Sequence, residues 1–166
     1  TGITNGVHIP TWVAESIQLR CAVRSPYINE QTVALTDGEL WGVHEDLRTE
    51  LIRFVQKHTG VSFNTKALTL TWARRFATYK RPEVLFSEIE TLKKLATSAH
   101  GALQIIIAGK AHPKDTEGKA VIARIVETIE KENLKNWVVF LPNYDMKIAR
   151  FLVQGSDVWL NTPIRG

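Results

Sequence analysis

The chain contains a short, almost wholly apolar run, Ala102-Leu103-Gln104-Ile105-Ile106-Ile107-Ala108, which lies between two glycines. An apolar run of this length, without regular polar alternation, is typical of a strand that is buried on both faces of a parallel sheet. Parallel neighbours are joined by crossover connections, which are usually helical. This stretch therefore predicts an α/β fold in which the flanking segments alternate between strands and helices.

Strand-like and helix-like segments do alternate around this run. We expect three further strands, at 67–72, 137–141 and 157–160. Amphipathic stretches that should be helices separate the four strands, at 82–96, 116–133 and about 144–155. Strands separated by helices form βαβ units, and right-handed crossovers place them in one parallel sheet with helices on both faces. The sequence thus predicts a Rossmann-like, doubly wound parallel sheet.

Each expected helix carries apolar residues along one face. The first presents Leu85, Ile89, Leu92 and Ala96, and the second presents Val121 or Ile122 together with Ile125 and Ile129. The third presents Ile148, Leu152 and Val153. We expect Asn143 to cap the third helix and Gly155 to end it.

A longer helix is predicted before the first strand. Thr36-Asp37-Gly38-Glu39 has the spacing of a capping box, in which a hydroxyl and a carboxylate three residues apart satisfy the first amides of a helix. Apolar residues then recur on one helical face, at Leu40, Val43, Leu47, Leu51 and Phe54. The helix should run to about Lys57 and end at His58-Thr59-Gly60.

The segment before this helix lacks a sustained period. Residues 1–26 should form turns and short pieces, followed by a loop through Asn29 and Gln31. We therefore divide the chain into a linker and helical segment (1–60) and a partial Rossmann-like C-terminal domain (61–166). The chain starts at a threonine and stops soon after a strand-like run, so we expect a fragment of a longer protein.

The composition excludes several classes of function. The chain has 166 residues, 44% of them hydrophobic, which suits one core. Its net charge of +4 is spread along helices that also carry acids, so we do not expect nucleic-acid binding. No apolar run could span a bilayer and no signal segment opens the chain, so we expect a cytoplasmic protein without a membrane partner. The lone Cys21 suggests no disulfide or metal site, and we expect a small buried residue rather than a nucleophile.

A basic stretch follows the first expected strand, with Arg74, Arg75, Lys80 and Arg81 within eight residues. In an open α/β sheet, such a loop lies at the carboxyl end of its strand, where ligands bind beside helix N-termini that favour anions. The commoner origin of a basic run is a solvated surface loop, and spacing does not decide between the two. If the loop binds a ligand, the ligand should contain phosphate.

Two more loops should reach the same edge of the sheet. The second offers Gly109, Lys110 and His112, and the third offers Asn143, Tyr144 and Asp145. An arginine donates in a planar fork and a lysine is a movable point charge, so Arg75 and Lys80 could hold one phosphate between them. Gly109 would let the backbone approach a ligand closely. Neither a glycine-rich dinucleotide loop nor a Walker loop is present, so side chains should bind the phosphate.

Two of these loop residues have simpler alternatives. For His112, a ring satisfied by a loop carbonyl is favoured over a catalytic role. For Tyr144, packing of a helix-end aromatic against the sheet and stacking on a ligand are both open. The remaining histidines have no partner spacing and should be structural or lie on the surface.

Three ordered motifs, together with the N-terminal part, resemble the α-glucan (glycogen, starch, maltodextrin) phosphorylases. The motifs are Arg74-Arg75-x-x-x-Tyr79-Lys80-Arg81, Ala108-Gly109-Lys110-Ala111-x-Pro113 and Val139-Phe140-Leu141-Pro142-Asn143-Tyr144. The N-terminal runs Thr4-Asn5-Gly6-Val7-His8-Ile9-Pro10-Thr11-Trp12 and Glu39-Leu40-Trp41-x-Val43-His44 resemble the short, prokaryotic branch of that family. The resemblance covers essentially the whole chain.

The resemblance implies part of a two-domain glycosyltransferase of the GT-B architecture. Such an enzyme uses inorganic phosphate to release glucose 1-phosphate from the end of an α-1,4-glucan, and it uses pyridoxal phosphate through the cofactor's phosphate. By the same resemblance, Arg75 and Lys80 would bind the substrate phosphate, Arg74 would lie near the cofactor phosphate, and Tyr144 would lie beside the pyridoxal ring. Gly109, Lys110 and Asn143 would have supporting roles.

The resemblance also implies what this chain lacks. In the family, the lysine that forms the Schiff base lies in a Glu-Ala-Ser-Gly-Thr-type segment that follows the position of Gly166, so we expect the isolated chain to be inactive. Two other functions stay open: a sugar-nucleotide transferase of the glycogen-synthase type, and a non-catalytic α/β module that binds phosphate.

Overall fold

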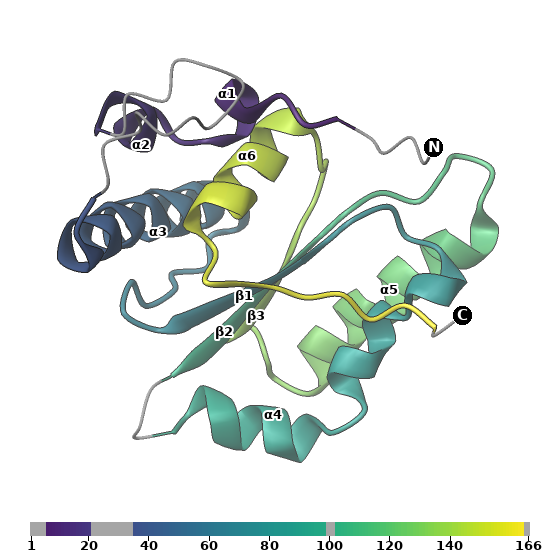
Figure 1. The fold of residues 1–166 in the computed structure, drawn as a ribbon. Helices are drawn as coiled ribbons and strands as arrows, with labels where there is room; N and C mark the ends of the chain where they lie inside the picture. The colour runs from purple at the N-terminus through teal and green to yellow at the C-terminus, as the bar shows by residue number, and fades with distance from the viewer. Residues whose placement is uncertain (1–5, 21–34, 99–101, 165–166) are drawn as a thin grey trace.

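The computed structural model describes residues 6–20, 35–98 and 102–164. A four-stranded parallel sheet lies at its centre, with helices on both sides (Figure 1). The strands are β1 (Leu68–Ala73), β2 (Leu103–Ala108), β3 (Val138–Leu141) and β4 (Val158–Trp159), in the order β3-β2-β1-β4. The predicted Rossmann-like α/β class is confirmed. Each predicted strand is present, and each of its bounds lies within one residue of the expected one.

The two central strands have the most extensive pairing. β1 and β2 pair along their full lengths, from Leu68 with Leu103 to Ala73 with Ala108. β4 pairs with β1 at only two positions, Leu70 with Val158 and Thr71 with Trp159. The chain leaves β1 toward β2 and later returns to the other side of β1, so the strand order reverses between β1 and β4. Ligands bind at such a reversal in open α/β sheets.

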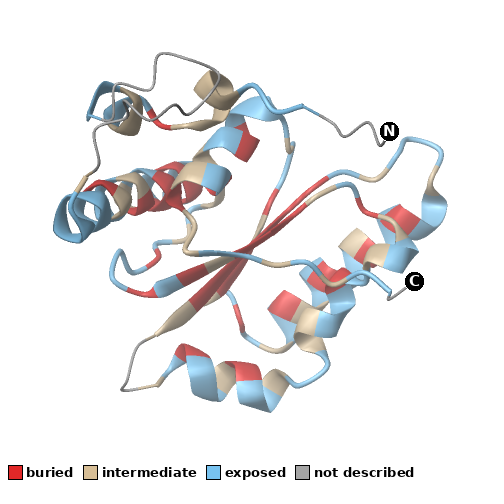
Figure 2. Cartoon of the chain, viewed as in Figure 1, coloured by how far each residue is buried: buried red, intermediate tan, exposed pale blue. Residues whose placement is uncertain are grey.

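Helices form one layer on each face of the sheet (Figure 1). One face is covered by α3 (Asp37–Thr59) and α6 (Met146–Gly155), and the other by α4 (Ile89–Ala96) and α5 (Thr116–Lys131). Two short helices, α1 (Ile9–Trp12) and α2 (Glu15–Arg20), lie beyond α3 and α6. Figure 2 shows that the buried residues concentrate in the strands and on the helix faces turned toward them.

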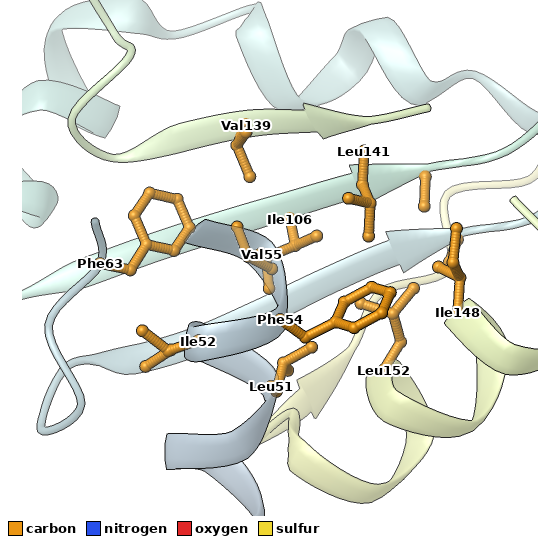
Figure 3. Packing of buried hydrophobic residues seen from close by; sticks show 12 residues of the cluster. Leu51, Ile52, Phe54, Val55, Phe63, Ile106, Val139, Leu141, Ile148 and Leu152 are labelled. Carbon is orange, nitrogen blue, oxygen red and sulfur yellow. The ribbon is translucent and has the colours of Figure 1, made fainter. Parts of the chain in front are cut away.

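Each face of the sheet has its own apolar cluster. Between the sheet and the pair α3 and α6, Leu51 and Val55 meet Ile106 and Leu152 (Figure 3). On the opposite face, Val121, Ile125 and Ile129 of α5 are buried in the second cluster. Ile122 is only partly buried against it, so Val121 is the more buried of the two alternatives. Because β2 contributes to both clusters, it is buried on both faces, as its sequence predicts.

The predicted start of α3 is confirmed. Thr36 Oγ1 accepts a hydrogen bond from the Glu39 amide at 3.3 Å, and Glu39 Oε2 accepts one from the Thr36 amide at 2.9 Å. Gly60 ends the helix with a left-handed φ of 75°. Val43, Leu51 and Phe54 are buried as expected, but Leu40 is 49% exposed because the first turns of α3 extend beyond the sheet (Figure 1).

The prediction of a single helix at 82–96 is wrong. The chain instead forms a 3₁₀ turn, η1 (Thr78–Lys80), a second 3₁₀ segment, η2 (Pro82–Phe86), and then α4. Glu88, with φ −128° and ψ 66°, interrupts the helical backbone between η2 and α4. The apolar stripe survives this break, since Leu92 and Ala96 remain buried.

The expected ends of the third helix also need correction. Asn143 does not cap α6: it adopts a positive φ of 60°, and the Asp145 carboxylate accepts the Ile148 amide at 2.8 Å instead. Gly155 is the last residue of α6 rather than a left-handed terminator. A Cβ there would lie 2.6 Å from the Leu47 carbonyl oxygen, so this glycine allows α6 to pack closely on α3. Val153, expected on the inner face, is exposed.

One of the buried polar side chains of the sheet is an amide. Gln104, on β2, is buried, and its amide nitrogen donates to Asn64 O at 3.0 Å and to Thr69 Oγ1 at 2.8 Å. Its amide oxygen accepts from the Asn64 amide at 3.0 Å. The side chain of Gln104 thereby connects β2 to β1 and to the turn that precedes β1.

The remaining predictions concern the N-terminal part. Cys21 and the loop through Asn29 and Gln31 lie outside the described residues. The proposed division of the chain near residue 60 would fall at the end of α3, whose inner face packs on the sheet. In the part of the chain that the structure describes, no helix is both long and apolar enough to cross a membrane.

Candidate functional site

Two of the three predicted loops are joined directly at the carboxyl edge of the sheet. The loop after β1 (74–81) and the loop after β2 (109–115) continue the pairing of their strands. The Arg74 amide donates to Ala108 O at 3.2 Å, and the Phe76 amide donates to Lys110 O at 2.9 Å. Phe76 is fully buried against Trp72. The two loops therefore leave the sheet side by side on a rigid base.

Gly109 has a steric reason to be glycine. A Cβ at this position would lie 2.1 Å from the Arg74 carbonyl oxygen and 2.6 Å from the Phe76 ring. The absence of a side chain thus permits the close approach of the two loops. The sequence suggested that Gly109 admits a ligand to the backbone; in the structure, the group that approaches it is the neighbouring loop.

These two loops carry four cations that have no acidic partner in the part of the chain that the structure describes. Arg75 and Lys110 are exposed, and Arg74 and Lys80 are half-buried. None of the four forms an ion pair with any residue in the described ranges. The Lys80 ammonium lies 5.6 Å from the centroid of the Tyr79 ring, a weak interaction that leaves its charge uncompensated. Unpaired cations gathered at one edge attract anions.

Arg81 differs from the other cations of the first loop. Its Nε donates to Thr162 O at 3.2 Å, and its Nη2 donates to Pro163 O at 3.1 Å. Its backbone is left-handed, with φ 43°, and it separates η1 from η2. The guanidinium of Arg81 thus holds the segment after β4.

The third loop contributes an aromatic side chain. Tyr144 is half-buried and packs against the cluster between α3 and the sheet, and burial raises the pKa of its hydroxyl. This packing against the sheet is the simpler of the two alternatives for Tyr144. Because the side chain is only half-buried, stacking on a ligand stays a prediction. Asn143 is exposed, and Asp145 is committed to capping α6.

His112 has a local structural partner. Its Nδ1 accepts a hydrogen bond from the Lys114 amide at 3.2 Å, in the turn that leads to the Asp115 cap of α5. The expected partner was a loop carbonyl, so the satisfied ring is confirmed but its partner is an amide. A ring held in this way stabilises the turn, and the residue itself is exposed.

A cluster of charged groups that the sequence did not reveal lies at the opposite end of the sheet. Asp157 precedes β4, and its Oδ1 accepts hydrogen bonds from His44 Nε2 at 2.6 Å and Arg48 Nη1 at 2.7 Å. Its Oδ2 accepts the Thr69 amide at 2.7 Å. Every partner is a donor to one carboxylate, so this cluster ties α3 to β1 and β4. His44 is thus structural, as expected.

The only local sign of this cluster was the spacing of His44 and Arg48, four residues apart on one helical face. Their acceptor lies more than a hundred residues later, and no periodic pattern predicts that contact. Thr162 was missed for the same reason, because its partners Lys80 and Arg81 lie on another loop.

Comparison with known proteins agrees with the motifs. A family model described as carbohydrate phosphorylase matches residues 3–162. The glycogen phosphorylase of Mycobacterium tuberculosis is 33% identical over 98% of this chain, and the maltodextrin phosphorylase of Thermococcus litoralis is 34% identical over 99% of it. The glycogen phosphorylase of Aquifex aeolicus is 32% identical over 98% of the chain. The chain spans only 22% of the length of the first two relatives and 27% of the third. On the strength of the family match and of these identities, the chain belongs to the carbohydrate phosphorylase family.

Proposed function

We propose that this chain forms the phosphate-binding part of an α-glucan phosphorylase. The full-length enzyme would transfer the terminal α-1,4-linked glucosyl residue of a glucan to inorganic phosphate and release glucose 1-phosphate in the cytoplasm. The observation that carries this proposal is a group of cations at the carboxyl edge of the sheet that have no acidic partner among the described residues. They lie on two loops that the backbone holds together. The relatives named for glycogen and maltodextrin support a glucan as the second substrate.

Arg75 and Lys80 are our candidates for binding the substrate phosphate. The guanidinium of Arg75 is exposed and can donate two parallel hydrogen bonds to a phosphate, while Lys80 adds a point charge from the same loop. Cations that are already in place when negative charge develops lower the barrier, because no reorganisation is needed during the reaction. Pairing with acids would have weakened this effect, and no acid of the described residues pairs with them.

The same edge fits the phosphate group of pyridoxal phosphate. Two phosphates in contact repel each other unless several cations neutralise both, and Arg74 with Lys110 would add charge beside Arg75 and Lys80. We assign Arg74 to the cofactor phosphate and Tyr144 to the pyridoxal ring, with Gly109 and Asn143 in supporting roles. When bound, the cofactor would supply acid–base chemistry through its phosphate. A tyrosine hydroxyl is neutral at physiological pH, so Tyr144 would add no negative charge to the site.

The experiment is an activity assay on the full-length protein that contains this chain. With maltodextrin and inorganic phosphate, we expect release of glucose 1-phosphate together with the absorbance of bound pyridoxal. Glucan elongation from a sugar nucleotide, without phosphorolysis, would instead indicate the glycogen-synthase type. If the protein shows neither of these activities and no pyridoxal absorbance, it is a non-catalytic module that binds phosphate.

A further inference from the structure

The loop after β4 and the loop after β1 are tied together by the side chain of Thr162. Its Oγ1 lies 2.7 Å from Lys80 O and 3.0 Å from Arg81 O, and it accepts a hydrogen bond from Trp72 Nε1 at 3.0 Å. A hydroxyl has one proton and two lone pairs, so it can accept from the indole while it donates to a carbonyl. Trp72 is fully buried in the core. The hydroxyl of Thr162 therefore fixes the turn at Lys80 relative to the core.

Residues of this turn also form hydrogen bonds with the segment after β4. Arg81 donates to the carbonyl oxygens of Thr162 and Pro163, and the Ile164 amide donates to Tyr79 O at 3.1 Å. Arg81 adopts a left-handed backbone, which is unfavourable for a residue with a Cβ. These hydrogen bonds offset that cost. The strained turn is thus maintained by its contacts with residues 162–164.

Lys80 lies in this turn, where a small shift of its backbone would move its ammonium group. Its side chain is long and flexible, so the place that its ammonium reaches depends on where the backbone of Lys80 is held. A displacement of about 1 Å in a charge-binding group is enough to lower the rate of a reaction by about a hundredfold. The Thr162 hydroxyl contacts the carbonyl oxygen of Lys80 itself, which is the most direct way to restrain that backbone.

We infer that Thr162 is a positioning residue for the binding of the substrate phosphate. Its hydroxyl, anchored by Trp72, sets the place of Lys80 and so couples the loop after β4 to the phosphate loop after β1. The two loops leave neighbouring strands at the point where the strand order reverses, which is where this fold class binds its ligands. This inference rests on the proposed function, because it gives Thr162 a part in the same phosphate site.

The test compares two substitutions in the full-length phosphorylase that contains this chain. Thr162→Val removes the hydroxyl at nearly constant volume, and Thr162→Ser keeps it. We expect Thr162→Val to raise the KM for phosphate by about tenfold, with the KM for glucan within about twofold of wild type, and Thr162→Ser to restore both. An unchanged KM for phosphate, or an equal rise for both substrates, would overturn the inference, because a purely structural role does not distinguish the substrates.

A double-mutant cycle tests whether Thr162 acts through Lys80. If it does, adding Thr162→Val to Lys80→Ala should worsen phosphate use by less than about twofold, whereas a further tenfold loss would contradict the inference. Should Thr162→Val fold poorly, Arg81→Ala releases the same segment from an exposed position and should raise the KM for phosphate selectively. If Arg81→Ala does not raise the KM for phosphate selectively, this result contradicts the inference. A normal phosphate response in Lys80→Ala alone would instead refute the proposed function of the loop.

Discussion

Arg48 and Asp157 lie 109 residues apart in sequence, and they form a 2.7 Å ion pair in which the two side chains are only 5% and 8% exposed. The pair joins the middle of α3 to the start of β4. His44 and the Thr69 amide donate to the same carboxylate, and Arg48 Nε also donates to Thr65 O at 2.8 Å. Because the Asp157 carboxylate is buried and accepts all three hydrogen bonds, removing its charge weakens the contacts of several donors at once.

We expect Asp157→Asn to lower the free energy of unfolding by about 3–5 kcal/mol, the usual cost of breaking a buried ion pair on one side. Urea denaturation of the chain would measure it. Glu83→Gln is a matched control, because Glu83 pairs with Arg124 on the exposed surface, and its unfolding midpoint should stay close to that of the wild type. Equal midpoints for the two variants would contradict a stabilising role for the buried pair.

The stability supplied by Asp157 should depend on pH. Burial by itself would raise the pKa of Asp157, but hydrogen bonds from the Thr69 amide, His44 and Arg48 outweigh it and lower this pKa below its ordinary value of 3.8. A carboxyl whose pKa is lowered by folding stabilises the protein fully above its pKa in the unfolded chain, and this stability is lost as the pH falls through the folded-state pKa. The difference in unfolding free energy between wild type and Asp157→Asn should therefore be constant near neutral pH and shrink below about pH 4. A difference that does not change between pH 7 and pH 3 would argue against the lowered pKa.

Gly155→Ala should destabilise the chain by about 1–3 kcal/mol, since the new Cβ would overlap the Leu47 carbonyl oxygen and the Leu51 Cβ and push α6 away from α3. Gly42→Ala, on the exposed side of α3, is the matched control. Nothing lies within 4 Å of a Cβ at that position, and alanine is the better helix former by about 1 kcal/mol, so this variant should be slightly more stable. Thermal unfolding of the two variants would show shifts of opposite sign. A Gly155→Ala variant as stable as wild type, or more stable, would mean that α6 does not need its close approach to α3.

On the proposed function, Arg75→Ala and Lys80→Ala in the full-length protein should each weaken the use of phosphate by about ten- to a thousandfold, because each would remove a positioned charge from a developing anion. The measurement is kcat/KM for phosphate in the direction of phosphorolysis. Lys94→Ala, which removes an exposed lysine from α4, should leave that value unchanged. Wild-type kinetics in both loop variants would refute the assignment of Arg75 and Lys80.

The sequence predicted those features that depend on local patterns. The run at 102–108, the capping box at Thr36 and the inner face of α5 each follow from residue spacing along one element, and each is confirmed. The site cations could be placed on the carboxyl edge because parallel strands end together. That part of the argument required only the order of strands and loops.

Predictions failed where two local signals compete or where the contact is distant. Asn143 and Asp145 are both good capping residues, and the structure uses Asp145 because its carboxylate reaches the Ile148 amide. Pro82 suits a helix start, but it opens a 3₁₀ segment and the helical backbone breaks at Glu88. The left-handed Arg81 before it donates to the distant carbonyls of Thr162 and Pro163, a contact that local propensity does not predict. The partners of Asp157 and of Thr162 come from distant parts of the chain, where single-sequence patterns carry no information.

The buried amide of Gln104 has a consequence for how the strands find their alignment. Side chains alternate between the two faces of a strand, so a slip of β2 by one residue would move Gln104 to the face opposite Asn64 and Thr69 and bury its amide without partners. The apolar residues of β2 offer little resistance to such a slip, because they suit either face. Gln104 is therefore the residue that selects one register among several that hydrophobicity alone would accept, and that register sets how far the loops after β1 and β2 extend beyond the sheet.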